Sequence, residues 1–535
     1  GPRSRFAKMR GPTRDLRPDL VMNLASLMVL ETAAPPAPAR DRAPWRGPRR
    51  KKSSGLVKGQ GGAGHRPGMQ DTASILRRLW APSLLALVAG CSSSAVVGVD
   101  GDGDGGSLPG DECEGACPSA QYASPLEGGW SEPMDLDATP DGGAVYFGRF
   151  AGELRFPGLV LDYSQYSGND EYLIKYAAGG SVEWVRRFKG NTVSGDVAVR
   201  PNGELVLFGT FQDTLDFGTG PLHANGFVDS FFMTILPDGT VLPPRVFDAE
   251  VHSYRTALSA NGDLIVAAQV DSTQTIDGVT LAATGATTAA VLRISPQGDI
   301  LAGHTLGPEV WLSGVAARPD GGGLFLGSNR QPISVGGISI PASSQGEGAF
   351  LLAVDAAGQP TWGEPIGPTP EDGDDLATAF PAGLGVRPDG RAVVVLGSTP
   401  VGWGVASPPG ELSLHTFESD GTELSHVTIG TSNSMYSDVA LASNGDILLA
   451  GSFTGELTLG DVELDSPNFQ DGFLARYSAA GELLWVETIG VPDSIQQVLN
   501  VAVATGDRPI MGGQYYGIGF SIGDDPMPET ESNPV

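Results

Sequence analysis

Carboxylates are the most abundant side chains in this sequence that could carry chemistry. Three of them, Asp100, Asp102 and Asp104, alternate in the order found in the first half of an EF-hand calcium loop. Asp111 stands where the bidentate glutamate of such a loop would be, but Ser107 occupies the usual apolar position. The run therefore predicts either a calcium loop at these four aspartates or, preferably, an acidic spacer without metal.

Other catalytic patterns are sparse. The sequence contains no G-x-S-x-G elbow, no phosphate loop and no dinucleotide fingerprint. The histidines of the acidic part have no metal-ligand spacing along the chain; they are His223, His252, His304, His415 and His426. Most acidic residues have no distinctive partner in sequence, so a solvated acidic surface is the preferred interpretation. No cofactor is expected apart from calcium.

A cysteine follows a short apolar segment between Met69 and Cys91. Arg77 and Arg78 form a positive n-region, and about 11 apolar residues follow, too few to span a bilayer. The segment ends in Leu-Val-Ala-Gly-Cys and resembles the lipobox of bacterial lipoproteins. That resemblance implies a signal peptide over 69–90, cleavage before Cys91 and a lipid anchor on its sulfur. The interpretation requires translation to begin near Met69.

Charge divides the chain into two parts. Residues 1–90 hold 17 of the 33 basic side chains and 5 of the 62 acidic ones, which leaves 16 basic and 57 acidic side chains and a net charge of -41 in 91–535. Residues 1–68 are rich in Pro, Arg and Gly, so we expect a disordered or non-mature extension there. The acidic part would repel phosphate backbones, which excludes nucleic acid as a partner.

The segment 91–118 reads as a flexible acidic tether, because it is rich in Gly, Ser and Asp. It also carries Cys113 and Cys117, which are candidates for a small disulfide in an oxidising compartment. Two cysteines are too few for a zinc site.

The rest of the chain is organised by repeated glycine turns. Two series of turn glycines recur at intervals of about 60 residues: Gly142, Gly203, Gly262, Gly321, Gly390, Gly445 and Gly506 in the first series, and Gly180, Gly239, Gly298, Gly358, Gly421 and Gly481 in the second. Many of them are preceded by turn residues such as Pro-Asp, Pro-Asn or Ser-Asn, and short apolar runs flank the turns. Each period therefore predicts two hairpins, or four antiparallel strands.

Four strands in each 60-residue period is typical of a β-propeller blade. We predict an all-β fold, a seven-bladed β-propeller over 119–523, followed by an acidic tail over 524–535. Six blades are complete, and the seventh is closed by N- and C-terminal strands. Ala120–Gly129 supplies its fourth strand, and its third strand is either missing or Ile518–Ile522.

With these residues in hand, the chain resembles the bacterial SBBP-type β-propeller repeat lipoproteins. The resemblance rests on the G-S-F-x-G-x-L-x-L-G stretch at Gly451–Gly460, the D-G-F-L-A-R-Y pattern from Asp471 and the G-E-L-L-W stretch from Gly481. The family is defined by fold and location, so the resemblance implies a cell-envelope protein and no particular reaction.

The connections between second and third strands are long and varied, whereas the other turns are tight. Variable loops on a rigid scaffold often carry binding, so we expect a binding face there, with Asp162, Asp170, Asp229 and Asp471 as candidate residues. The alternative is that these loops only cover the blades.

These features together predict a monomeric propeller anchored to the cell envelope, in the outer membrane or at the surface of a Gram-negative bacterium, that binds protein or glycan. The alternative is an extracellular hydrolase or lyase acting on polymers with calcium-assisted loops. Three or more carboxylates or histidines that converge at the central channel would favour the enzyme, whereas an uncharged or aromatic mouth would favour binding.

Overall fold

The structure is a computed structural model, and every element it describes is a β-strand, which confirms the predicted all-β class. It describes residues 23–32, 93–98, 118–156, 159–162, 170–342, 348–367, 377–400, 410–432, 435–490, 495–516, 521–522 and 525–526. All of them belong to one of the two compact units of the chain, the unit formed by 1–33 and 91–535. Among these residues there is no helix long and apolar enough to cross a membrane.

The repeating unit is a four-stranded antiparallel meander, in which each strand pairs with the next along the chain. Two consecutive sheets show it most simply, with the orders β11-β12-β15-β16 and β17-β18-β21-β22. Their bounds are β11 His252–Leu258, β12 Leu264–Val270, β15 Thr288–Ile294, β16 Ile300–Pro308, β17 Val310–Ala317, β18 Gly323–Asn329, β21 Gly348–Val354 and β22 Pro360–Ile366.

Elsewhere neighbouring sheets are joined by long strands that continue from one into the next. The first half of β7 pairs with β6, and its second half pairs with β8. The strands before β11 are β3 Pro118–Ala138, β4 Ala144–Phe156, β6 Asp170–Tyr176, β7 Val182–Val199, β8 Leu205–Asp216, β9 Pro221–Ile235 and β10 Arg245–Phe247. Those after β22 are β23 Ala377–Val386, β24 Ala392–Pro400, β25 Gly410–Phe417, β26 Glu423–Ser432, β27 Met435–Leu441, β28 Ile447–Leu459, β29 Val462–Tyr477, β30 Leu483–Ile489, β31 Ile495–Ala504 and β32 Arg508–Tyr516.

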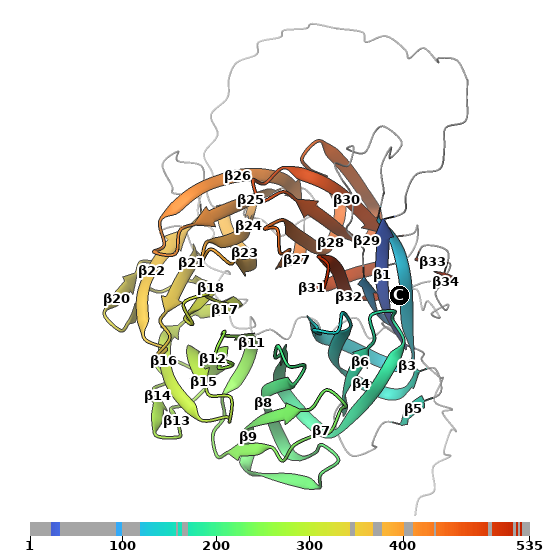
Figure 1. The fold of residues 1–535 in the computed structure, drawn as a ribbon. Helices are drawn as coiled ribbons and strands as arrows, with labels where there is room; N and C mark the ends of the chain where they lie inside the picture. The colour runs from blue at the N-terminus through green and yellow to red at the C-terminus, as the bar shows by residue number, and fades with distance from the viewer. Residues whose placement is uncertain are drawn as a thin grey trace, which may run out of the picture. The chain divides into compact units, whose positions relative to one another are not determined.

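Figure 1 shows these sheets arranged radially around a central opening. Inner hairpins line the opening: β3–β4, β7–β8, β11–β12, β17–β18, β23–β24, β27–β28 and β31–β32. From each of the first six hairpins the sheet continues outward into a third and a fourth strand. This radial arrangement is that of a β-propeller, and each sheet is a blade.

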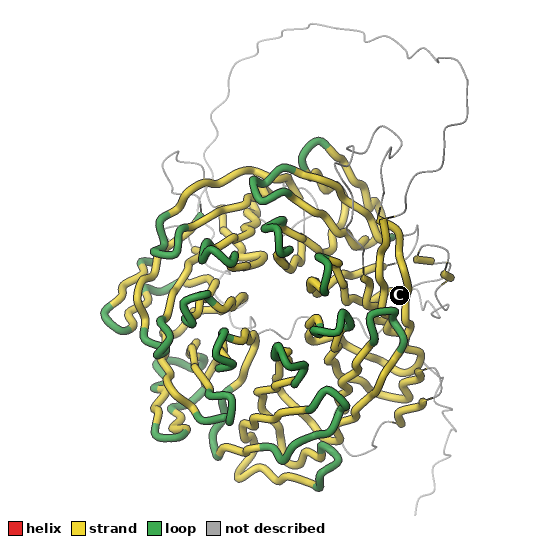
Figure 2. The backbone as a smooth tube through the Cα atoms, viewed as in Figure 1, coloured by secondary structure: helices red, strands yellow, loops and turns green. Residues whose placement is uncertain are grey.

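Tight glycine turns join the strands, as the spacing predicts (Figure 2). All of the turn glycines of both series have positive φ values, between 77° and 91°. At the first turn the Gly142 amide donates to the Thr139 carbonyl at 2.9 Å, and the Thr139 amide donates to the Gly143 carbonyl at 2.9 Å. Glycine takes such a φ without the steric cost that a Cβ brings, so these positions set the repeat.

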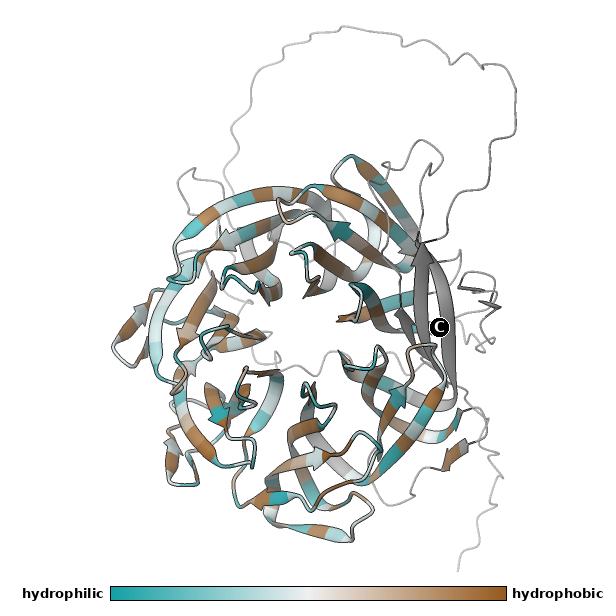
Figure 3. Ribbon diagram, viewed as in Figure 1, coloured by the Kyte–Doolittle hydropathy of each residue, from teal (hydrophilic) through white to brown (hydrophobic). Residues whose placement is uncertain are grey.

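Apolar side chains fill the spaces between adjacent blades. Val206 and Phe208 of β8 pack with Leu264 and Val266 of β12 in one buried cluster, and similar clusters occupy the other blade boundaries. The second and third strands of the blades are buried on both faces and largely apolar, and they carry many of the brown segments in Figure 3. Burial on both faces explains why their sequences are continuous apolar runs.

Arginine side chains connect neighbouring blades at the turns. In each case the guanidinium of one blade donates to a turn carbonyl of the next blade in chain order, at 2.5–3.1 Å: Arg186 to Gly239, Arg245 to Gly298, Arg293 to Gly321, Arg318 to Ser419 and Arg387 to Ala479. These hydrogen bonds join the turns of neighbouring blades around the opening. Each bond is strengthened by the positive charge of its donor.

The last inner hairpin is tied to the first blade in the same way. Arg508 of β32 donates to the Ala178 carbonyl at 3.0 Å and to the Gly142 carbonyl, and its side chain is buried. Ala502, Ala504 and Ile510 join Tyr146 and Ile174 of the first blade in one apolar cluster. Residues more than 350 positions apart in sequence therefore meet here.

Two further strands lie beyond β32 in the same sheet, β2 Ser93–Gly98 and β1 Asn23–Thr32. β2 pairs antiparallel with β32, and β1 lies between β2 and the first half of β3. β1 lies within the segment 1–68 predicted as a disordered or non-mature extension, and β2 lies within the predicted tether over 91–118. Ser521–Ile522, which lies within the alternative third strand, pairs instead with β34 Asp525–Pro526.

The long second-to-third connections fold as small hairpins. Examples are β13 Gln274–Ile276 with β14 Val279–Leu281, and β19 Ile333–Val335 with β20 Ile338–Ile340. The apolar residues of these hairpins are buried in the clusters at the blade boundaries. Packing therefore accounts for the length of these connections, which favours the alternative that they cover the blades.

Replacing Arg508 by alanine tests the closure between the last hairpin and the first blade. We expect Arg508→Ala to lower the free energy of unfolding in urea by about 2–4 kcal/mol, because two carbonyl groups lose a charged donor. Arg391→Ala is the control, since Arg391 forms exposed ion pairs with Asp389 and Glu418 and its loss should leave the stability nearly unchanged. Equal losses in both variants would contradict the proposed role of Arg508.

Candidate site in the central channel

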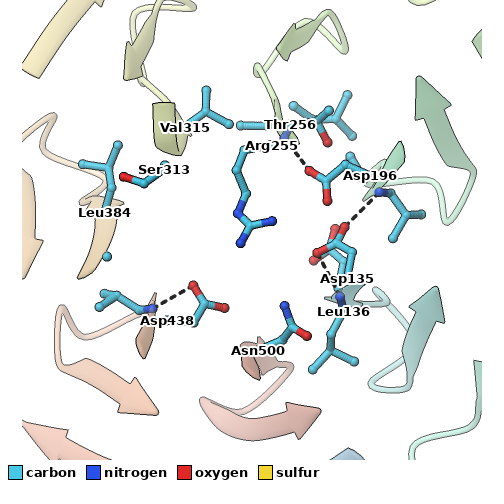
Figure 4. Close-up of a pocket in the computed structure, with 18 of the residues that line it drawn as sticks. Asp135, Leu136, Asp196, Arg255, Thr256, Ser313, Val315, Leu384, Asp438 and Asn500 are labelled. Atoms are coloured by element: carbon cyan, nitrogen blue, oxygen red, sulfur yellow. Dashed lines mark hydrogen bonds between the residues drawn. The ribbon is translucent and has the colours of Figure 1, made fainter. Parts of the chain in front are cut away.

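The inner strands of several blades bring charged and polar side chains together in the central channel. They line a cavity of 310 Å³, and Figure 4 shows how they converge from β3, β7, β11, β27 and β31. The polar members are Asp135, Asp137, Asp196, Arg255, Thr256, Ser313, Asp438 and Asn500. The cavity is at the lower end of the range typical of small-molecule sites.

One position of the repeat supplies four of these eight polar residues. It lies on the innermost strand, seven residues before the first-series turn glycine, and its occupants in the first six blades are Asp135, Asp196, Arg255, Gly314, Gly383 and Asp438. The sequence analysis did not identify these residues, although their constant offset from the turn glycines is a signal that could have found them.

Each aspartate at this position binds the backbone of the next blade. Asp135 Oδ2 accepts from the Val197 amide at 2.8 Å, and Asp438 Oδ2 accepts from the Val501 amide at 2.9 Å. Asp196 accepts in the same way from the Thr256 amide. The inner strands of adjacent blades converge here without pairing, so the carboxylates satisfy amides that would otherwise be unpaired.

Asp137 repeats this contact one step closer to the turn. Its Oδ2 accepts from the Val199 amide and its Oδ1 accepts from the Ala138 amide, both at 2.8 Å. Burial nonetheless raises the pKa of Asp137 to about 7, with a smaller contribution from the Asp135 carboxylate, because these outweigh the two backbone bonds.

Two further carboxyl groups in the channel hold their protons more tightly than usual. Burial is the main cause of the raised pKa of Asp196, and the neighbouring Asp135 carboxylate raises it further through repulsion and a shared hydrogen bond. Burial also raises the pKa of Asp438, against the opposing effects of the Val501 amide and Arg255. Asp137, Asp196 and Asp438 therefore bind protons more readily in the folded protein than free aspartates do.

Arg255 is the one basic side chain among the described residues that line the cavity. Burial lowers the pKa of its guanidinium, but the carboxylates of Asp196, Asp438 and Asp135 outweigh burial and raise it. The side chain points into the channel in Figure 4 and partly neutralises the cluster. Four carboxyl groups against one guanidinium leave the cavity acidic.

On β17 and β23 the same repeat position is a glycine, so no side chain from this position enters the channel. A Cβ at Gly383 would come within 2.3 Å of a methyl carbon of Val439, and a Cβ at Gly314 would lie 3.2 Å from that of Leu384. The inner strands of these blades therefore approach each other too closely for a side chain. The charged groups are confined to the remaining strands.

The candidate residues predicted from sequence lie elsewhere or outside the described residues. Those outside are Cys91, Asp100, Asp102, Asp104, Asp111, Cys113 and Cys117. Asp162 lies in β5 Leu159–Asp162, and only its backbone is described. Among the residues that the structure describes, Asp170, Asp229 and Asp471 do not line the cavity.

Asp170, Asp229 and Asp471 occupy equivalent positions in third strands, where each pairs with a phenylalanine of the second strand. Asp170 is buried and accepts from the Arg187 guanidinium at 2.7 Å, and Asp229 is buried and accepts from the Asn225 amide at 2.9 Å. Burial raises the pKa of Asp471, while a hydrogen bond from Ser466 lowers it. These carboxylates contact residues of their own blades, and their membership of a binding face stays a prediction.

Comparisons with known proteins give only distant likenesses. No family model matches the chain, and no curated protein matches it. A luciferin-regenerating enzyme is 9% identical over 74% of this chain and 94% of its own, with a TM-score of 0.32. An ulvan lyase of polysaccharide lyase family PL25 is 8% identical over 68% and 94%, with a TM-score of 0.33. The Pan2 WD40 domain of Neurospora crassa is 9% identical over 75% and 98%, with a TM-score of 0.32.

The buried carboxyl groups predict an unusual pH dependence. A group whose pKa is raised on folding binds more protons in the folded state, so stability falls as pH rises from about 4 to about 7. We expect Asp137→Asn to reduce the loss of stability between pH 5 and pH 8 by about 1–3 kcal/mol, a range that allows for the open channel.

Urea unfolding at both pH values measures this effect. Asp389→Asn is a matched control, because Asp389 is a turn carboxylate outside the channel and accepts from the Arg391 amide. The same pH dependence in the wild type and in Asp137→Asn would show that Asp137 does not titrate as described.

Proposed function

We propose that this protein is a lipid-anchored β-propeller of the cell envelope that binds a protein or glycan ligand. The observation that carries the proposal is the acidic channel, in which Asp135, Asp196 and Asp438 are each held by an amide of the next blade. Carboxylates fixed in this way form a preorganised surface, because binding a ligand need not order them.

The binding site in this proposal is the channel and not the long connections. The four carboxyl groups outnumber the one guanidinium, and a ligand with an amino or guanidino group favours their ionised forms, so the cavity suits such a ligand. A basic protein segment or an amino-sugar glycan has this chemistry. Calcium is a further candidate for the same oxygen-rich cavity.

The proposal includes seven blades, the last of which is completed by segments from both ends of the propeller. It is supported by the inner hairpin β31–β32, by its bonds to the first blade through Arg508, and by the pairing of β2 with both β32 and β3 next to it. A closed ring leaves no exposed sheet edge, which suits a stable monomer.

Anchoring is proposed through Cys91. The support is the succession of n-region, apolar stretch and Leu-Val-Ala-Gly-Cys in the sequence. Ser92 follows the cysteine, which agrees with sorting to the outer membrane of a Gram-negative bacterium.

A second candidate function is an extracellular hydrolase or lyase acting on polymers. It is favoured by the convergence of four carboxyl groups in the channel, which meets the criterion set from the sequence for an enzyme. Asp196 with a raised pKa beside Asp135 could hold and release a proton, as general acid–base catalysis requires. Loss of turnover of a polysaccharide in Asp196→Asn would support this candidate.

Membrane attachment is tested by Cys91→Ser expressed in a Gram-negative host. We expect the wild-type protein in the detergent-soluble membrane fraction and the variant in the soluble fraction, because only the thiol accepts the diacylglycerol. Cys113→Ser is the control and should stay in the membrane fraction. A wild-type protein that fractionates as soluble, or whose mass includes residues 1–90, would contradict the anchor.

Ligand binding is tested on a glycan array and in pull-downs from envelope extracts, with and without calcium. For a ligand captured by the wild-type chain, we expect Asp438→Asn to weaken binding about five- to tenfold through the loss of one charge interaction of about 1 kcal/mol. Asp389→Asn should bind like the wild type. Capture that is unchanged in Asp438→Asn and insensitive to salt would place the ligand outside the channel.

A further inference from the structure

Three metal-binding side chains meet on the outer hairpin of one blade. The hairpin is formed by β25 and β26, and His415 lies directly opposite His426 in its register. Glu423, at the start of β26, pairs with Phe417 and lies on the same side of the hairpin. This group is remote from the cavity described above.

The donor atoms of the group are close together. His415 Nδ1 lies 2.8 Å from Glu423 Oε1, and His426 Nδ1 lies 3.5 Å from the same oxygen. One ligand atom from each residue can be chosen so that all three lie within 4.8 Å of one another. The two imidazole rings stack with centroids 5.5 Å apart and an interplanar angle of 26°.

The spacing along the chain conceals this group. In a regular strand the side chains of Glu423 and His426 would point to opposite faces, because they are three residues apart. A register shift between Thr416 and Phe417 inserts Leu424 as an extra residue and returns Glu423 to the face of His426. The spacing of His415 and His426 along the chain therefore gives no sign that the two rings are close together.

Other blades carry apolar or small residues at the same three positions. The equivalent sets, taken from the same pairing and the same register shift, are Ile174, Val182 and Val185; Leu292, Ile300 and Gly303; Leu352, Pro360 and Gly363; and Ala475, Leu483 and Val486. None of these sets contains a metal-binding side chain. In the β23–β26 blade all three positions have changed together to residues that ligate metals.

We propose that His415, Glu423 and His426 form a site for a divalent transition metal, with Zn²⁺ as the reference ion. Two imidazole nitrogens and one carboxylate oxygen are ligands that Zn²⁺ prefers, and three protein ligands leave a fourth position for water or an external group. Such a metal replaces the hydrogen bond between His415 Nδ1 and Glu423. It crosslinks the two strands of the hairpin from the outside.

The surroundings of the three residues support this assignment. His415 is only 6% exposed, and its Nε2 lies 2.9 Å from Ser413 Oγ, so the ring is held with Nδ1 directed at Glu423. A partner on the second ring nitrogen is the usual support of a metal-binding histidine. The side chains of Glu423 and His426 are 44% and 68% exposed, so an ion reaches them directly from solvent.

A second group of possible ligands provides an internal comparison. Glu250, His252 and Asp271 also lie within 4.8 Å of one another, but this group has one imidazole, which contacts Thr210 Oγ1 through Nδ1. A set with one nitrogen and two carboxylates suits Zn²⁺ less well than the pair of histidines. We therefore place the metal at the β25–β26 hairpin.

The test is a titration of the full-length, chelator-treated protein with Zn²⁺ by calorimetry, and with Co²⁺ followed by its visible absorption. We expect one tight site per chain, with the absorption of a tetrahedral or five-coordinate Co²⁺ ion. Glu423→Gln and His426→Ala should each weaken Zn²⁺ binding by at least about tenfold, since even losing a supporting contact costs about 10–100-fold. Both side chains are exposed, so these variants should fold.

His223→Ala and His252→Ala are the controls. His223 is an exposed histidine whose ring contacts Thr214 Oγ1, and its loss should leave the affinity unchanged. His252→Ala should also retain the tight site. The proposal is overturned if the wild type shows no Zn²⁺ binding, if Glu423→Gln and His426→Ala bind like the wild type, or if His252→Ala is the variant that loses the site.

Discussion

The structure depends on side chains that hydrogen-bond to the backbone of the next blade. The blades fan out from a narrow channel, so adjacent inner strands converge but cannot pair as a continuous sheet. Aspartates such as Asp135 and Asp438 accept hydrogen bonds from backbone amides that have no strand partner on the channel side. Arginines such as Arg387 donate hydrogen bonds to turn carbonyls of the next blade. Apolar packing between blades has no direction, whereas these bonds fix how each blade is rotated against the next.

The same constraint explains the chemistry of the channel. An aspartate that binds an amide must point across the blade boundary near the axis, where carboxylates of several blades come close to one another. Burial and mutual repulsion then raise their pKa values, most clearly for Asp137, and Arg255 offsets only part of the charge. The polar, acidic channel is therefore a consequence of aspartates that join adjacent blades. In the proposed function, the ligand binds to these same carboxylates.

Much of the fold could be predicted from the sequence because the turn glycines are a strong local signal. The hairpins within the long connections were missed, although Asp277-Gly278 and Gly336-Gly337 between alternating apolar residues are two-residue turn signals of the same kind. The channel residues could have been found from their offset to the turns. Strands near the ends, such as β1, carry no repeat signal, and their place depends on pairing with distant residues.

A repeat protein offers an internal comparison that an isolated site does not. At positions that the strand register makes equivalent, the residues of the other blades show what packing alone requires. A different type of residue in one blade therefore needs another explanation. His415 stands where Ile174 and Leu352 are buried in other blades, and burying an imidazole there costs free energy unless its polar atoms are satisfied. Glu423 and Ser413 satisfy both ring nitrogens, but His426 contributes little to packing, since it is largely exposed. A metal ion accounts for all of these residues at once, whereas a buried hydrogen-bonded histidine accounts for only part of them.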